Sequence, residues 1–223
     1  MIKAYKGFDK NMQCRGFQFE EGKSYEEPEA ILCMKGFHAC ENPIDVFQYY
    51  APGESIFREV ELEDVSEMRE KDSKVCGNKI KIGEEISLRD MILEGVKIDI
   101  KTANESTSGN SSPAATAGEY SHAATSGDYS PAATSGNSSP AATSGNFSHA
   151  ATSGKESIAA AIGRKSKAKS TIGNWIVLAE YGAWNGKYCP VLCVKCGKID
   201  GETLKPDVWY RLNGGEFEEV MGK

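Results

Sequence analysis

The chain has 223 residues, 32 acidic and 26 basic side chains, a formal net charge of −6 at pH 7, 23 glycines and seven cysteines. This acidic balance argues against nucleic acid as a partner, and no run approaches the roughly 20 apolar residues that span a membrane. Because the first residues also lack the apolar stretch of a secretion signal, we expect a soluble protein, made in a cytoplasm, whose cysteines stay reduced.

Residues 1–101 are predicted to form an α+β domain. Three short apolar runs favour β-strands: Ile2–Tyr5, Ser55–Leu62 and Lys79–Ile82. A helix is predicted from Asn42 to about Tyr50, because asparagine caps a first turn and the following Pro43 fits its first position.

Three segments of this domain, YKGF, GKSYEE and KGFHACENPIDVFQYYAPGESIFREVEL, form a pattern. A first strand carries Tyr5-Lys6-Gly7, a later strand carries Gly36 to Ala39, and the helix ends at Tyr49-Tyr50. This order resembles the front half of small ADP-ribosyltransferases of the rifampicin-modifying and diphtheria-toxin-like groups. The resemblance implies an ADP-ribosyltransferase-like fold with NAD as cofactor and four pocket residues: Tyr5, Lys6, His38 and Tyr50.

Two departures from that pattern count against activity. Lys6 stands where those enzymes carry a histidine or arginine that grips the nicotinamide-side ribose. A catalytic glutamate is expected near the C-terminus, where Glu180 and Glu216 are the candidates without further support. His38 is the one histidine suited to acid–base work, and a lone histidine between Phe37 and Ala39 is more often structural.

A nine-residue repeat occupies residues 102 to about 171. Its units read SGNSSPAAT, AGEYSHAAT, SGDYSPAAT, SGNSSPAAT and SGNFSHAAT, and they decay into SGKESIAAA and IGRKSKAKS. The strict period argues against a disordered linker, and the glycine, serine and proline argue against a helical array. Because nine residues hold one strand and one turn, we predict a narrow parallel β-solenoid. Two units would close one coil, although other numbers of units stay open.

Two features of the repeat leave its geometry less determined. We expect the repeated glycine, for example Gly136, to adopt positive φ in the turn. The slot before the alanine pair holds proline or histidine, which favours an outward orientation. In a later unit the same slot holds Ile158, followed by Ala160 and Ile162, which favours an inward one. The sequence leaves this orientation open.

The last repeats carry Ser157-Ile158-Ala159, Ile162-Gly163 and Ser166-Lys167-Ala168. These residues resemble the β-roll repeats of trimeric autotransporter adhesin heads and of some phage tail fibres. The resemblance supports the solenoid and implies self-association.

Residues 172–223 are predicted to form a β-hairpin cap on the solenoid. Ile176 to Leu178 is an apolar run, and Asp200-Gly201 and Asn213-Gly214 are typical hairpin turns. Trp209, Tyr210, Leu212 and Phe217 flank the second turn, and we interpret them as core residues.

Two further groups are candidate sites. Cys189, Cys193 and Cys196 have a spacing that would suit a metal if a fourth ligand joined them, but buried thiols on a strand are the simpler interpretation and no metal is expected. The basic group consists of Arg164, Lys165, Lys167 and Lys169, of which the three lysines would share one face of a strand. This group could bind phosphate or an acidic partner, or be a solvated face.

The whole chain resembles an uncharacterised phage-encoded family with a YKGF/GFHAC front, Ala-Gly-Ser repeats and an IVLAE…KPD-WY-L-GEF-EV tail. The sequence predicts a mainly β, non-catalytic interaction protein without a cofactor, in which the solenoid is a rigid scaffold or binding surface. The resemblance places it in a host cytoplasm or a virion, as a host-defence inhibitor or virion accessory protein. It implies a host or virion protein partner and a homo-oligomer. The alternative is an NAD-dependent ADP-ribosyltransferase.

Overall fold

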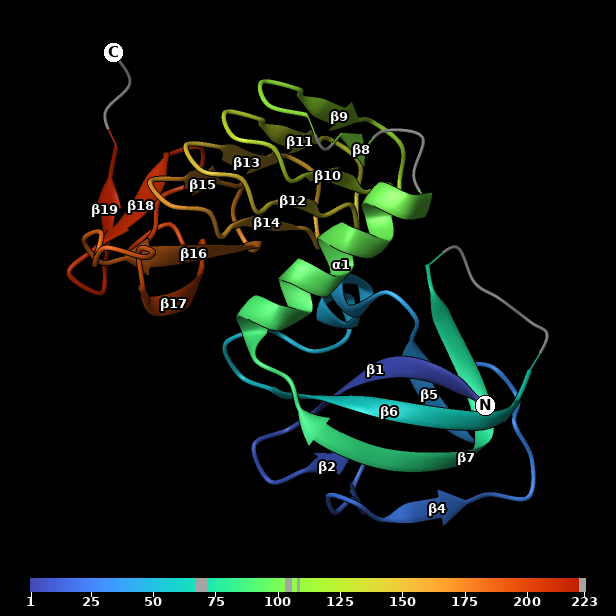
Figure 1. The fold of residues 1–223 in the computed structure, drawn as a ribbon. Helices are drawn as coiled ribbons and strands as arrows, with labels where there is room; N and C mark the ends of the chain where they lie inside the picture. Colours follow the sequence, from blue (N-terminus) through green and yellow to red (C-terminus); the bar gives the residue numbers. More distant parts are fainter. Residues whose placement is uncertain (67–71, 103–105, 108, 221–223) are drawn as a thin grey trace. The chain divides into compact units, whose positions relative to one another are not determined.

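A computed structural model describes residues 1–66, 72–102, 106–107 and 109–220 (Figure 1). The fold is mainly β, as predicted, and the chain divides into two compact units, Met1–Gly95 and Val96–Lys223. The first boundary therefore lies a few residues before the predicted one at residue 101. Within the described residues, no helix is long and apolar enough to cross a membrane.

The first unit is an antiparallel sheet that closes on itself. Its strands are β1 (Ile2–Phe8), β4 (Ser24–Glu26), β5 (Phe37–Cys40), β6 (Ile56–Val65) and β7 (Lys74–Glu85). They lie in the order β4-β7-β5-β1-β6, and β6 also pairs with β7, which completes a ring (Figure 1). Fully buried Phe8, Leu62 and Ile82 lie in its core. All three predicted strands are present within β1, β6 and β7.

Three smaller elements accompany this sheet. Strands β2 (Gln13–Cys14) and β3 (Phe17–Gln18) form a hairpin. The predicted helix is a short 3₁₀ helix, η1 (Pro43–Gln48), and Asn42 caps it by accepting a hydrogen bond from the Ile44 amide. Helix α1 (Leu88–Thr102) was not predicted, and its start is marked by reciprocal bonds between Ser87 and Asp90.

The second unit contains the predicted parallel β-solenoid. One sheet is formed by β8 (Ser106–Thr107), β10 (Ala123–Thr125), β12 (Ala141–Thr143), β14 (Ile158–Ala161), β16 (Trp175–Tyr181) and β17 (Val191–Lys198). The other is formed by β9 (Ala114–Thr116), β11 (Ala132–Thr134), β13 (His149–Thr152), β15 (Lys167–Lys169), β18 (Tyr210–Asn213) and β19 (Glu216–Glu219). Strands two repeats apart pair in parallel, with Ala123 opposite Ala141 and Ala132 opposite Ala150, so two repeats close each coil (Figure 1).

The orientation of the repeat positions is now defined. The first alanine of each pair points inward and forms a continuous core row from Ala114 to Ala168. Threonine two positions later is also inward, and Thr125 donates to the Ser130 carbonyl at 2.6 Å. The proline, histidine and isoleucine slot lies one position before the inward alanine and therefore faces outward. Of the two alternatives that the sequence left open, the outward one applies, and Ile158, Ala160 and Ile162 are nevertheless buried outside the solenoid core.

The repeated glycine does not adopt the positive φ that we predicted. A Cβ on Gly136 would instead lie 2.0 Å from the Gly118 carbonyl oxygen, one coil away. The residue two positions after each glycine has the left-handed conformation, for example Ser138 with φ 50° and Tyr129 with φ 58°. Glycine is therefore required because successive coils approach closely at the turn.

Side-chain ladders connect each coil to the next. The Ser157 hydroxyl accepts from the Ser139 amide at 3.1 Å, and the Ser139 hydroxyl donates to the Gly118 carbonyl at 3.0 Å. At the turns, the Asp128 carboxylate accepts from the Asn146 amide at 2.8 Å. Because alanine burial adds little hydrophobic free energy, these polar ladders and the backbone pairing hold the rod together.

Antiparallel strands end the solenoid at its C-terminal side. Strand β17 pairs with β16, and the β18–β19 hairpin joins β15 through Ala168 and Tyr210. The Asn213-Gly214 turn is a hairpin as predicted, whereas Asp200-Gly201 begins the connection from one sheet to the other. The second hairpin, β16–β17, contains Asn185-Gly186. Here larger residues such as Ile176 and Leu178 replace alanine in the core.

Candidate functional site

A cavity of about 540 Å³ lies within the first unit, a size typical of small-molecule sites. Its walls come from β1, the β2–β3 hairpin, β5 and the end of η1. All four residues of the implied pocket lie on its lining: Tyr5, Lys6, His38 and Tyr50. The structure therefore brings together residues that are up to 45 positions apart in the sequence.

Antiparallel pairing of β1 with β5 explains how these side chains meet. Tyr5 lies opposite Cys40, so the following Lys6 reaches the β5 backbone and donates to the His38 carbonyl at 2.8 Å. Gly7 leaves room for the Tyr50 ring, because a Cβ there would lie 2.3 Å from the ring carbon Cγ. The glycine of the YKGF segment thus shapes the pocket wall.

Lys6 is the most unusual residue of the pocket. Its side chain is buried, with 6% of the residue exposed, and burial lowers the pKa of its ammonium group. Its nitrogen lies 5.6 Å from the Phe8 ring centroid and 6.0 Å from that of Phe19. Among the described residues, no carboxylate forms an ion pair with it.

The other polar groups hold one another in place. His38 Nε2 accepts from the Cys33 amide at 2.8 Å, and burial together with the charge of Lys6 lowers the pKa of the imidazole. The Tyr50 hydroxyl lies 2.9 Å from Cys14 Sγ, and burial raises its pKa. His38 is therefore a neutral acceptor at pH 7 and Tyr50 a neutral phenol.

The charges around the cavity are mostly positive. Arg15, Lys35 and Lys74 join Lys6 on the lining, and among the described residues the single carboxylate there is that of Glu27. Arg15 and Gly16 form the β2–β3 turn with φ 50° and 78°, the two positive values of a type I′ turn. Sequence reasoning missed Glu27 and Arg15, because nothing in their local patterns distinguishes them from surface residues.

The proposed C-terminal glutamates have other roles. Glu180 accepts the Gly214 and Gly215 amides at 2.9 and 2.7 Å and so holds the β18–β19 turn, and these bonds lower its pKa. Glu216 is highly exposed and pairs with Lys195 at 2.7 Å.

The basic group does not form the single face that was predicted. Lys165 lies in a turn with φ 56°, and it and Arg164 lie over the Phe147 ring. Lys167 and Lys169 lie on β15, with their nitrogens 4.9 and 5.2 Å from the Trp209 ring centroid. The group is thus two separate cation–aromatic contacts. Trp209 packs on this outer surface, unlike Tyr210 and Leu212, which are in the core as predicted.

The three C-terminal cysteines do not converge. Cys193 and Cys196 are three positions apart on β17, so their side chains point to opposite faces of the strand. No cluster of metal-ligating side chains occurs among the described residues.

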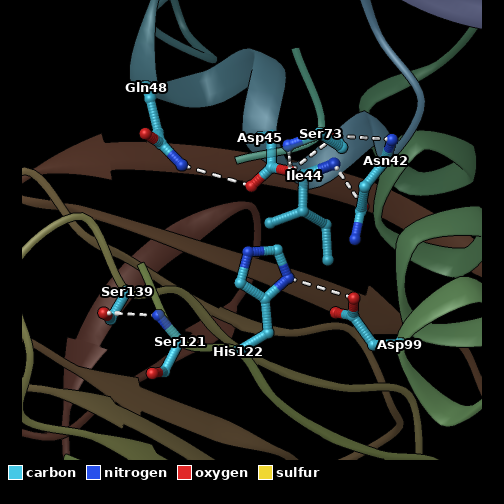
Figure 2. A network of polar contacts seen from close by, with 9 residues as sticks. All are labelled: Asn42, Ile44, Asp45, Gln48, Ser73, Asp99, Ser121, His122 and Ser139. Carbon is cyan, nitrogen blue, oxygen red and sulfur yellow. Dashed lines mark hydrogen bonds and ion pairs between the residues drawn. The ribbon is translucent and has the colours of Figure 1, made fainter. Parts of the chain in front are cut away.

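Figure 2 shows buried polar contacts that support each unit. In the first unit, Asp45 of η1 accepts from the Ser73 amide and hydroxyl at 3.0 and 2.6 Å. In the second unit, Asp99 of α1 lies 3.0 Å from His122 Nδ1. His122 occupies the outward slot that proline fills in other repeats. Its contact is therefore structural.

Residues 2–94 match a family model described as a domain of unknown function, DUF7666. No curated protein is significantly similar to the chain. The same holds for solved structures. The pocket-bearing unit, Met1–Gly95, is thus similar to this family over nearly its whole length.

Proposed function

We propose that the protein is a non-catalytic interaction protein whose solenoid is a rigid scaffold. The observation that carries this proposal is that the repeated residues of each unit help to stack one coil on the next. Glycine permits the close turn, serine and asparagine bond the next coil, and alanine and threonine fill the interior. In a rod built in this way the described inward side chains are used for packing and internal hydrogen bonds, and the outer faces are free to serve as surfaces.

One outer surface of the rod is a candidate contact face. The outward residues of the β9-β11-β13 sheet are small and at least partly exposed: Pro113, Ala115, Pro131, Ala133, His149 and Ala151. The equivalent positions Ala124, Ala142 and Ala160 of the other sheet are at most 1% exposed. These positions carry no charged side chain as far as Lys167 and Lys169 of the neighbouring strand β15. Such a flat surface suits another flat protein surface, and a second copy of the chain always offers one.

Light scattering at micromolar concentration tests this contact face. We expect a mass above that of one 24.2 kDa chain, and Ala133→Glu should lower it to one chain because a carboxylate would be buried at the contact. Lys155→Glu, in the exposed bend that follows β13, is the control and should keep the assembly. A wild-type mass of 24.2 kDa would contradict self-association.

The second candidate is an NAD-dependent ADP-ribosyltransferase. The observation in its favour is that Tyr5, Lys6, His38 and Tyr50 line one cavity with a single carboxylate, Glu27. In such a transfer the bond from nicotinamide to the ribose breaks, and an acceptor nucleophile forms the new bond while losing a proton. A carboxylate can stabilise the positive charge that develops on the ribose.

Labelled NAD distinguishes the two candidates. The interaction protein should release no nicotinamide and label no protein in a host lysate above background. The enzyme should do both, and Glu27→Gln should then reduce the rate about a hundredfold, since loss of one charge-stabilising group has that effect. Glu29→Gln, a neighbouring exposed carboxylate paired with Lys35, is the matched control.

A further inference from the structure

We infer that the cavity of the first unit binds a small organic anion, a carboxylate or phosphate on a flat apolar body, with the Lys6 ammonium group as its counter-ion. This goes beyond the proposed scaffold function, since it assigns a ligand class to the other unit. It also differs from the NAD interpretation, in which the residue at this position would hold a neutral ribose.

The hydrogen bonding of the Lys6 ammonium group is incomplete. An ammonium group has three hydrogen-bond donors. One donates to the His38 carbonyl at 2.8 Å, and another lies near the Cys14 thiol, which is a weak acceptor. A buried charge is costly unless a counter-charge and hydrogen bonds compensate it. Lys6 lines the open cavity, so an anion entering there could take the remaining donors.

The charged side chains at the cavity are mostly positive. Arg15 lines it from the turn of the β2–β3 hairpin, is exposed, and has no ion pair among the described residues. Lys35 and Lys74 also line the cavity, where Glu27 is the one carboxylate among the described residues, although Glu29 outside the lining pairs with Lys35 at 2.9 Å. Like charges around a low-dielectric cavity raise the local concentration of the opposite ion. The lining therefore favours an anion over a neutral or cationic ligand.

Aromatic side chains form much of the remaining lining. Phe17, Phe19 and Phe37 lie on it, and edge-to-face contacts connect Phe19 with both of the others, with ring centroids 4.8 and 6.1 Å apart. Phe17 is 46% exposed although it is a large apolar residue. Aromatic side chains around a few polar groups are typical of sites for flat organic molecules. The ligand thus combines an anionic end near Lys6 with an aromatic or similar flat body.

Ligand-observed NMR with three matched probes tests the inference: benzoate, phenyl phosphate and the neutral benzamide. The full chain should bind at least one of the two anions about tenfold more tightly than benzamide, a difference of about 1.4 kcal/mol. The tighter anion identifies the carboxylate or the phosphate as the natural group. Equal affinity for benzamide, or no binding of either anion up to about 10 mM, would overturn the inference.

Two variants test whether the preference for an anion depends on Lys6. Lys6→Met keeps most of the length of the side chain and removes its charge, so anion binding should weaken about tenfold while benzamide binding stays unchanged. Lys10→Met removes an exposed positive charge from the same unit and should change neither. Unchanged anion binding in a folded Lys6→Met protein would overturn the inference. If that variant does not fold, the comparison of the three probes on the wild-type chain still shows whether the cavity prefers an anion over a neutral ligand. None of these readouts involves the solenoid or NAD turnover, so this inference and the proposed function can fail separately.

Discussion

At the scale of single residues, the repeat shows how one amino acid can be required for a reason that the sequence does not reveal. Glycine recurs beside asparagine or aspartate, which is typical of turns with positive φ. In the structure that conformation belongs to the residue two positions later, such as Ser138 or Phe147. The glycine is needed because the backbone of the next coil lies against it, and a contact between residues 18 apart cannot be seen in one repeat.

This difference leads to a test by substitution. Gly136→Ala should lower the free energy of unfolding by ~3 kcal/mol, because the added methyl would overlap the Gly118 carbonyl oxygen. Gly109→Ala, where the nearest atom is the Ser112 hydroxyl at 2.9 Å, is the matched control and should cost much less. Urea unfolding measures both. Equal losses of unfolding free energy in the two variants would show that backbone conformation, rather than the close approach of the next coil, requires glycine at these positions.

Glu180 gives a prediction about pH. Its pKa is lowered in the folded protein by the amides of Gly215 and Gly214. A lowered folded-state pKa contributes stability that is complete above the unfolded value, about 4.5, and is lost as the pH falls through the folded value. Urea unfolding should therefore show the wild type to be more stable than Glu180→Gln at pH 7, with the difference shrinking below pH 4.5. A difference that does not depend on pH would contradict this role.

At the scale of elements, the nine-residue period was sufficient to predict one strand and one turn per repeat, but it left the number of repeats per coil open, and the pairing of strands two repeats apart defines that number. The orientation of the strands was not predictable. Ile158, Ala160 and Ile162 are buried as their character suggests, but on the outer face of their sheet rather than in the solenoid core. Burial on both faces of a strand removes the alternation on which orientation arguments depend.

The coil register can be tested by deletion. Removing residues 127–144 deletes one whole coil and leaves every later strand in its own sheet. This variant should keep the β signal in circular dichroism and unfold cooperatively. Removing residues 127–135 deletes half a coil and moves every later strand to the opposite sheet, away from the cap that fits it. That variant should lose cooperative unfolding. Equal behaviour of the two would contradict a coil of two repeats.

At the scale of the whole molecule, the sequence and the structure contribute differently to the two units. The solenoid follows from the visible repeat. The pocket residues of the first unit were grouped through a family resemblance, and the structure places all four on one cavity. Glu27 and Arg15 could not be found in this way, because they reach the cavity through a loop and a tight turn whose positions depend on the closed sheet.

The central claim is a rigid scaffold in which residues 18 apart are neighbours, and cysteine cross-linking tests it most directly. The Tyr129 and Phe147 rings stack at 5.0 Å across adjacent coils, whereas Ser138 lies one repeat from each, in the turn that follows the opposite sheet. Under mild oxidation, the pair Tyr129→Cys and Phe147→Cys should form a disulfide that peptide mapping distinguishes from the seven native cysteines. The pair Tyr129→Cys and Ser138→Cys should not. A disulfide between positions 129 and 138, or equal yields for both pairs, would contradict the scaffold.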